Sequence, residues 1–205
     1  MYLANIFPKY LQNLRPKRSL LVHMNIHQQT SHVTMASEGT SQKKLPRFLC
    51  LHGFRTSGAI LKKQIFDNWP ARVVDKLDLV FVDAPFPCQG KSEVEGMFEP
   101  PYFEWYQFNK GAVISGGLRG LQDKGVGLTK VQKIKYLIII GGAKFQNESV
   151  AVKAYSSPIT CPSVHFLGEQ DYLKKYGMEL LDLYVDPVII HHPQGHTIPR
   201  LGQPL

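Results

Sequence analysis

The sequence predicts an α/β fold, in which a parallel sheet carries helices on its two faces. The first observation is a series of short apolar runs that end abruptly at glycine or a polar turn, as Arg47–Leu51 does. The second is that segments with helical character separate these runs. Short apolar runs are typical of strands buried on both faces, and their alternation with helices indicates βαβ units.

The expected elements follow one another along the chain. Strands are expected at 47–51, 77–82, 134–140, 163–167 and 187–191. Helices are expected at 58–66, 70–76, 111–124, 149–155 and 172–183. Residues 84–110 are expected to be irregular, because they combine four prolines with a dense aromatic group. That group is expected either to line an acyl pocket or to cover the sheet edge.

One expected helix, 111–124, has no strand before it. The residues that precede it, 102–110, are aromatic and polar and lack the usual β-branched stretch. A parallel sheet needs a strand before each crossover helix. The sequence therefore indicates that a strand is missing between Asn109 and Gly111.

The 205 residues indicate one domain, 47–205, preceded by an extension, residues 1–46. The extension has six basic residues, a single acid and no periodic pattern, so we expect it to be disordered. Its composition is compatible with an organelle transit peptide in residues 1–34, and also with an upstream stretch of no function.

Charge and cysteine content exclude several classes of protein. The net charge of +8 is concentrated in the extension, so the body has no basic stripe and we expect no nucleic-acid partner. No apolar run approaches the roughly 18 residues that a membrane span requires. The three cysteines are far apart and form no CxxC pair, so we expect reduced thiols rather than disulfides or a zinc site.

Two candidate catalytic side chains follow the last two expected strands. Asp171 comes after 163–167 and His196 after 187–191, and open α/β sheets place their sites at such strand ends. Acid before histidine is the order of the α/β-hydrolase triad, in which the carboxylate orients the imidazole that takes the nucleophile's proton. The alternatives are that Asp171 caps the helix beginning at Tyr172 and that His196 is an ordinary loop histidine.

The turn after the first strand is a candidate oxyanion loop. It consists of His52, Gly53 and Phe54, and such a turn can offer a backbone N–H to an oxyanion. No nucleophile accompanies it, since Gly-x-Ser-x-Gly occurs nowhere in the sequence. Cys50 lies inside a strand, where a thiol is expected to be inert.

A metal site could be suggested by His191, His192 and His196. The spacing of 192 and 196 suits a metal only when a helix places both side chains on one face. Pro193 and Gly195 make that helix unfavourable. We therefore expect no metal and no cofactor.

Five motifs occur in order over about residues 45–201. They are Leu51-His52-Gly53-Phe54-Arg55-Thr56-Ser57-Gly58, Val82-Asp83-Ala84-Pro85, Ile139-Ile140-Gly141-Gly142, Gly168-Glu169-x-Asp171 and His192-Pro193-x-Gly195-His196-x-x-Pro199-Arg200. Together they resemble the FSH family of serine hydrolases, small esterase-type α/β-hydrolases, and most of all its plant members. The resemblance implies that Asp171 and His196 are the acid and base, that Phe54 belongs to the oxyanion loop, and that small esters are the substrates.

The chain departs from the family at the nucleophile. Family members have a strand followed by Gly-Phe-Ser-Gln-Gly-Ala, whereas Asn109-Lys110 here runs directly into Gly111-Ala112. The serine, the second oxyanion N–H and the nucleophile strand are thus expected to be absent. The family's closing C-terminal helix is also expected to be absent, since the chain ends nine residues after His196. These departures predict an incomplete α/β-hydrolase fold of lowered stability.

Three functional hypotheses follow. The leading one is membership of the serine hydrolases, which hydrolyse carboxylic esters by acyl transfer, with this chain itself inactive. The second is a non-catalytic binding or regulatory module, and the third is a non-functional splice product. The expected location is the cytoplasm or the nucleus, or an organelle if residues 1–34 are a transit peptide.

Overall fold

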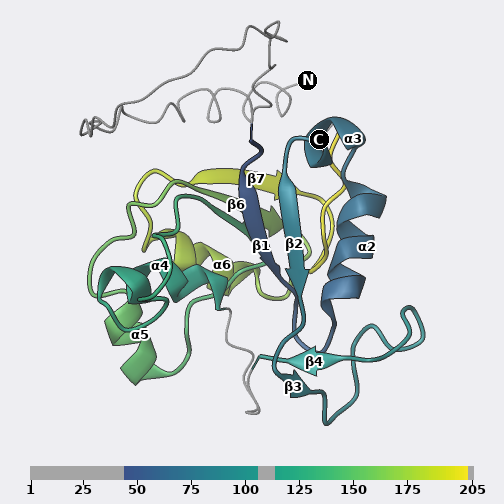
Figure 1. The fold of residues 1–205 in the computed structure, drawn as a ribbon, viewed down its shortest axis with the longest axis horizontal. Helices are drawn as coiled ribbons and strands as arrows, with labels where there is room; N and C mark the ends of the chain where they lie inside the picture. The colour runs from purple at the N-terminus through teal and green to yellow at the C-terminus, as the bar shows by residue number, and fades with distance from the viewer. Residues whose placement is uncertain (1–43, 106–113, 203–205) are drawn as a thin grey trace, which may run out of the picture.

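Parallel strands lie at the centre of the computed structural model, which describes residues 44–105 and 114–202 (Figure 1). The main strands are β1 (Arg47–Leu51), β2 (Asp78–Val82), β5 (Leu137–Ile140), β6 (Ser163–Gly168) and β7 (Val188–His192). The helices are α2 (Gly58–Asn68), α3 (Ala71–Val74), α4 (Ser115–Asp123), α5 (Glu148–Ala154) and α6 (Lys174–Leu181). A short antiparallel ribbon joins β3 (Phe86–Pro87) to β4 (Phe103–Glu104).

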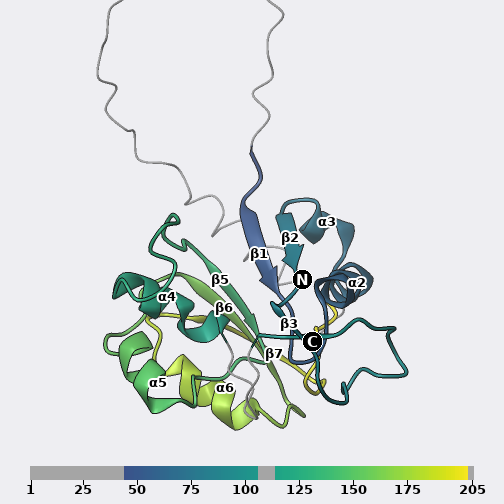
Figure 2. The ribbon, with the colours of Figure 1, turned by 60° about the horizontal axis from the view of Figure 1, so that its bottom comes forward.

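The parallel strands form two separate sheets. β1 pairs with β2, with Leu49 opposite Val80, and β5, β6 and β7 form a three-stranded sheet with β6 in the middle. Figure 2 shows these as two distinct groups of strands. Over the described ranges, no backbone ladder joins β1 to β5. Within these ranges, β1 pairs with β2 alone and β5 pairs with β6 alone.

Side-chain packing joins the two sheets. Phe166 of β6 is fully buried in a cluster that includes Trp69 and Ile190. Apolar residues of both sheets pack against this cluster, among them Phe48, Cys50, Leu79, Phe81, Ile138 and Ile140. Apolar surface removed from water stabilises by about 25 cal/mol per Å², so this shared core can hold sheets that no described backbone ladder joins.

A second apolar cluster lies on the other face of the three-stranded sheet. Leu137 and Ile139 of β5 point into it, together with Leu180 of α6 and Tyr184, whereas Ile138 points to the first cluster. This alternation is the period of two that a strand imposes on its side chains. Helices α4, α5 and α6 lie on the side of the second cluster, and α2 and α3 on the side of the first (Figures 1 and 2).

The expected order of elements is confirmed for the described residues. Residues 84–105 differ from expectation, because β3 and β4 form a ribbon there. Helix 111–124 is described from residue 114, and its helical part is Ser115–Asp123. The expected gap between Asn109 and Gly111, and the extension up to residue 43, lie outside the described residues. No described helix is long and apolar enough to cross a membrane.

The outward face of the β1–β2 pair is exposed. The side of β1 away from the core carries Leu49, which is 61% exposed, and its partner Val80 is 37% exposed. In an intact doubly wound sheet, both faces of such strands are covered by helices. The exposure of Leu49 therefore indicates that this strand makes few of the contacts of a central strand.

Two leucine-to-alanine substitutions test this difference in packing. Leu180→Ala removes a side chain that is 0% exposed, and we expect it to lower the free energy of unfolding by about 2–5 kcal/mol. Leu49→Ala, the matched control, should change it by less than about 0.5 kcal/mol, because Leu49 lies mostly in water. Urea denaturation of both variants is the measurement, and similar losses would show that β1 is covered in solution.

Candidate active site

Asp171 and His196 lie in contact at the carboxyl ends of β6 and β7. Nδ1 of His196 is 3.0 Å from Oδ2 of Asp171. The Asp171 side chain is 3% exposed and that of His196 is 36% exposed. Because a carboxylate only accepts hydrogen bonds, Nδ1 carries the proton, and the lone pair of a neutral His196 ring is on Nε2.

Asp171 has a second partner in the chain that follows it. Its Oδ1 accepts a hydrogen bond of 2.7 Å from the backbone N–H of Leu173, immediately before α6. The expected helix start at Tyr172 differs from the structure, because α6 begins at Lys174 with Leu173 as its N-cap and without a side-chain capping bond. One Asp171 carboxylate oxygen thus accepts from the turn before α6, and the other contacts His196. This backbone contact holds the carboxylate through the oxygen that does not contact His196.

Glycines allow the strand ends and the histidine loop to approach. Gly141, after β5, has φ of +57°, and a Cβ there would lie 2.7 Å from both Cε1 and Nδ1 of His196. A Cβ on Gly168 would lie 2.5 Å from the carbonyl oxygen of Gln194. Real side chains do not tolerate such distances, so these positions need glycine for the Asp171–His196 contact to form.

Tyr172 is a site residue that the sequence did not predict as such. Its ring centroid is 5.2 Å from that of His196, and the residue is 65% exposed. Partial burial raises the pKa of its phenol, and the nearby carboxylates of Glu93 and Asp171 raise it further. Glu93 belongs to the loop after β3, so this contact brings residues of the 84–105 segment to the candidate site.

His52 holds the oxyanion loop in shape. Its Nε2 accepts a hydrogen bond of 2.9 Å from the N–H of Ala84, so Nδ1 carries the proton and donates to the carbonyl oxygen of Gly53 at 2.8 Å. Burial lowers the pKa of this imidazole, and the bond to Gly53 offsets part of that effect. Trp105 donates from Nε1 to the His52 carbonyl oxygen at 2.8 Å. His52 is thus a structural member of the loop.

Phe54 lies in the exposed turn that follows. Its side chain is 46% exposed, and the Arg55 guanidinium lies 4.7 Å from its ring centroid. Within the described residues, the Phe54 N–H has no hydrogen-bond partner. An unpaired N–H in this turn can donate a hydrogen bond to an oxyanion.

Arg55 fastens this turn to the segment 85–105. Its Nε donates to Oε1 of Glu104 at 2.6 Å, and Glu104 is 4% exposed. The hydroxyl of Ser92 donates to the Arg55 carbonyl oxygen at 2.6 Å, and Arg55 has a left-handed φ of 53°. These contacts join the turn after β1 to a segment about 40 residues later in the chain, and no sequence pattern indicated them.

Serines near these elements have structural partners. Ser57 accepts a hydrogen bond from the N–H of Ile60 and caps α2. Ser92 has the contact with Arg55, and Ser163 lies 3.1 Å from Nε2 of the fully buried His165. Across residues 44–105 and 114–202, no serine hydroxyl forms a hydrogen bond with His196. The Lys110–Gly111 junction, where the family has its elbow, lies outside the described residues.

The other C-terminal histidines have separate environments. Nδ1 of His191 is 2.7 Å from Oε1 of Glu169 on the exposed surface. His192 is 5% exposed, and its Nδ1 has no partner within the described chain. Burial lowers the pKa of His192. In the part of the chain that the structure describes, no three histidine, cysteine or carboxylate residues are grouped as metal ligands.

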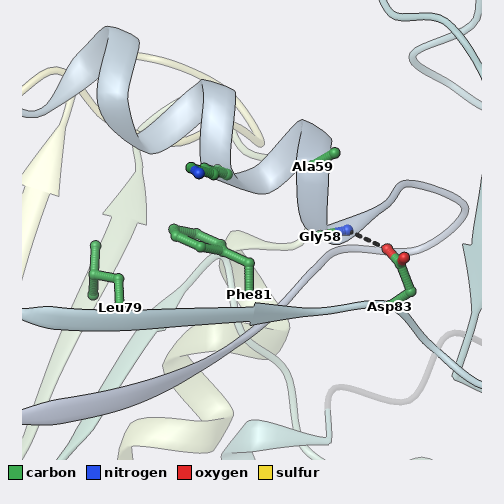
Figure 3. A pocket seen from close by; sticks show the side chains of 6 residues that line it. Gly58, Ala59, Leu79, Phe81 and Asp83 are labelled. Carbon is green, nitrogen blue, oxygen red and sulfur yellow. Dashed lines mark hydrogen bonds between the residues drawn. The ribbon is translucent and has the colours of Figure 1, made fainter.

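A pocket of about 340 Å³ lies between α2 and β2 (Figure 3). It is lined by Gly58, Ala59, Lys62, Leu79, Phe81 and Asp83. The N–H of Gly58 donates to Oδ1 of Asp83 at 2.8 Å, so the helix N-terminus already has an acceptor (Figure 3). None of its lining residues belongs to the Asp171–His196 pair or to the oxyanion turn.

Parallel strands with an Asp–His pair at their carboxyl ends define an α/β-hydrolase-like protein. The family model described as "Serine hydrolase (FSH1)" matches residues 41–110 and 106–204, which is most of the chain. The chain therefore belongs to the FSH1 serine hydrolase family. This confirms the family that the sequence motifs indicated.

Named relatives of this chain are esterases. An esterase of Aedes aegypti is 28% identical over 210 residues, which cover 82% of this chain and 74% of the relative. An esterase of Anopheles gambiae is 23% identical over 203 residues, covering 78% and 74%. The esterase OVCA2 of Xenopus tropicalis is 38% identical over 66 residues, covering 31% of this chain and 28% of the relative.

Gly141→Ala should displace the His196 ring. The added methyl group would clash with that ring, and alanine would have to adopt the left-handed backbone conformation of Gly141. We expect the free energy of unfolding to fall by about 1–2 kcal/mol from the backbone strain and by about 1–3 kcal/mol from the clash. Gly125→Ala is the matched control, because Gly125 has φ of +67° and open space around its Cα. Denaturation and the NMR signals of the His196 ring measure the difference. Equal losses and an unmoved ring in both variants would contradict the proposed packing.

His165 should make stability depend on pH in the acid range. Burial lowers its pKa from 6.5 to about 4, so the unfolded chain takes up a proton between these values that the folded chain does not. The contribution of His165 to the free energy of unfolding is fully present above pH 6.5. It falls by about 3 kcal/mol as the pH decreases toward 4. Denaturation at several pH values should show a shallower decline for His165→Gln, and an unchanged decline would rule out this assignment.

Proposed function

We propose that this serine hydrolase family member retains the acid–base pair of an ester-hydrolysing site and lacks the serine that would use it. The observation that carries the proposal is the contact between Asp171 and His196, 3.0 Å long, with no serine hydroxyl on His196 among the described residues. The sequence itself contains no Gly-x-Ser-x-Gly. Without the nucleophile, an enzyme of this type keeps only a small part of its rate enhancement.

The alignments support an internal gap. The Aedes aegypti alignment spans 210 residues but takes in 82% of this chain, and 82% of 205 residues is about 168. About 40 aligned positions of that relative therefore have no counterpart in this chain. The two segments of the family match overlap at residues 106–110, beside the junction of Lys110 and Gly111. That is where the sequence indicates the loss of a strand and the serine elbow.

A second candidate function is a folded module that binds acyl compounds or a partner without turnover. The observation that favours it over a non-functional product is the packed core, in which Phe166, Ile139 and Leu180 are at most 2% exposed. A core of this kind is typical of a folded protein rather than of a collapsed fragment. The exposed Tyr172 ring beside His196 offers such a module an aromatic contact.

Fluorophosphonate labelling tests the lack of an active serine. The probe forms a covalent bond only with a serine whose hydroxyl is activated by a base. We expect no labelled serine peptide after incubation of this chain, as judged by mass spectrometry. Labelling at any serine would overturn the proposal.

An insertion variant is the positive control. The segment that the Aedes aegypti esterase has at this point, placed between Lys110 and Gly111, should supply the missing strand and serine. We expect labelling of the inserted serine and its loss in the double variant with His196→Gln. If the inserted chain folds and its serine stays unlabelled, Asp171 and His196 are not a working acid–base pair.

A further inference from the structure

Nε2 of His196 has no hydrogen-bond partner among the described residues, and the His196 side chain as a whole is 36% exposed. In a complete triad this atom would face the serine hydroxyl. Here Asp171 still holds Nδ1 and its proton, so the lone pair on Nε2 of the neutral ring points away from the carboxylate. An imidazole in this state is itself a nucleophile.

We propose that His196 is an acyl acceptor for activated aryl esters. Nε2 attacks the ester carbonyl carbon, a C–N bond forms, the C–O bond to the aryl group breaks, and its electron pair leaves with the phenolate oxygen. The acyl-imidazolium that results keeps its Nδ1–H on Asp171, whose negative charge stabilises it. Water then attacks the acyl carbon, the C–N bond breaks with its electron pair returning to Nε2, and carboxylic acid and neutral His196 are released. The proton that the attacking water loses passes to the departed phenolate or to solvent.

The preference for an aryl leaving group follows from the use of His196 as the nucleophile. A phenolate with an electron-withdrawing substituent departs without protonation, whereas an alkoxide needs a general acid. His196 is occupied as the nucleophile in this reaction, so it cannot also protonate the leaving group. The exposed ring of Tyr172, 5.2 Å from the His196 ring, offers an aromatic leaving group a surface on which to stack.

His196 differs from the other histidines that the structure describes. His52, His165 and His192 are 1–5% exposed, so an ester cannot reach their rings. His191 is exposed and also has a carboxylate on Nδ1, at 2.7 Å. That carboxylate, Glu169, is 46% exposed and is shared with Lys174, so water and the ammonium group weaken its effect on the imidazole. His191 is therefore the matched control for His196.

The inference rests on the proposed function in one respect, because an active serine would take the acyl group first. The two can be separated by the residue that carries the acyl group. Acyl or fluorophosphonate label on a serine would overturn the proposed function, whereas label on neither a serine nor His196 would overturn only the present inference.

Hydrolysis of p-nitrophenyl acetate by the full chain is the first measurement. We expect His196→Gln to lower the protein-dependent rate by about a hundredfold, the usual contribution of one positioned side chain, while His191→Gln leaves it unchanged. Tyr172→Ala should slow aryl ester cleavage more than it slows transfer from an acyl donor without an aromatic group. Equal rates for His196→Gln and His191→Gln would overturn the proposal.

Direct detection of the adduct keeps the test independent of folding in the variants. The unaltered chain is incubated with p-nitrophenyl trimethylacetate, whose hindered acyl group slows hydrolysis of an acyl-imidazole, and is then quenched in acid and digested. His191 and His196 fall on one tryptic peptide, since neither Lys nor Arg lies between them. We expect fragmentation of that peptide to place the acyl mass increment on His196 and not on His191. Turnover without any adduct on His196 would indicate that His196 acts as a general base on an attacking water, and would overturn nucleophilic attack.

Discussion

The structure depends on one apolar cluster, which holds two sheets that no described backbone ladder joins. Phe166 of β6 is at its centre, with Phe48 and Phe81 of the β1–β2 pair packed against it from the other sheet. In an intact parallel sheet, a strand between β1 and β5 would add directional hydrogen bonds to this contact. Apolar packing is non-directional, so it keeps the two sheets together with less control over their relative orientation.

The residues of the candidate site are also divided between the two sheets. Asp171 and His196 belong to the three-stranded sheet, where Gly168 is opposite His192 in the β6–β7 register. Phe54 belongs to the other sheet and is fastened by Arg55 to the 85–105 segment. Each half has its own local contacts, and within the described residues no backbone ladder joins the two sheets that carry them.

The sequence predicted those features that depend on local pattern. Strand β6 was expected at 163–167 and ends at Gly168, because an apolar run between Pro162 and a glycine has few alternatives. Asp171 and His196 were predicted from their place after parallel strands, which brings such residues to one edge. The β3–β4 ribbon was missed, since it is only two residues a side and contains Pro87. Tyr172 and Arg55 were missed because their contacts join loops far apart in the chain.

Acyl transfer by histidine makes smaller demands on this fold than acyl transfer by serine. The serine reaction needs three side chains from three strands and two oxyanion donors, all positioned to within a fraction of an ångström. The histidine reaction needs Asp171 and His196 alone, and these follow two strands whose pairing is intact. The Asp171 carboxylate is also held independently by the Leu173 N–H. The gap proposed at Lys110–Gly111 would therefore remove the serine chemistry, whereas the geometry that the imidazole requires is present in the described residues.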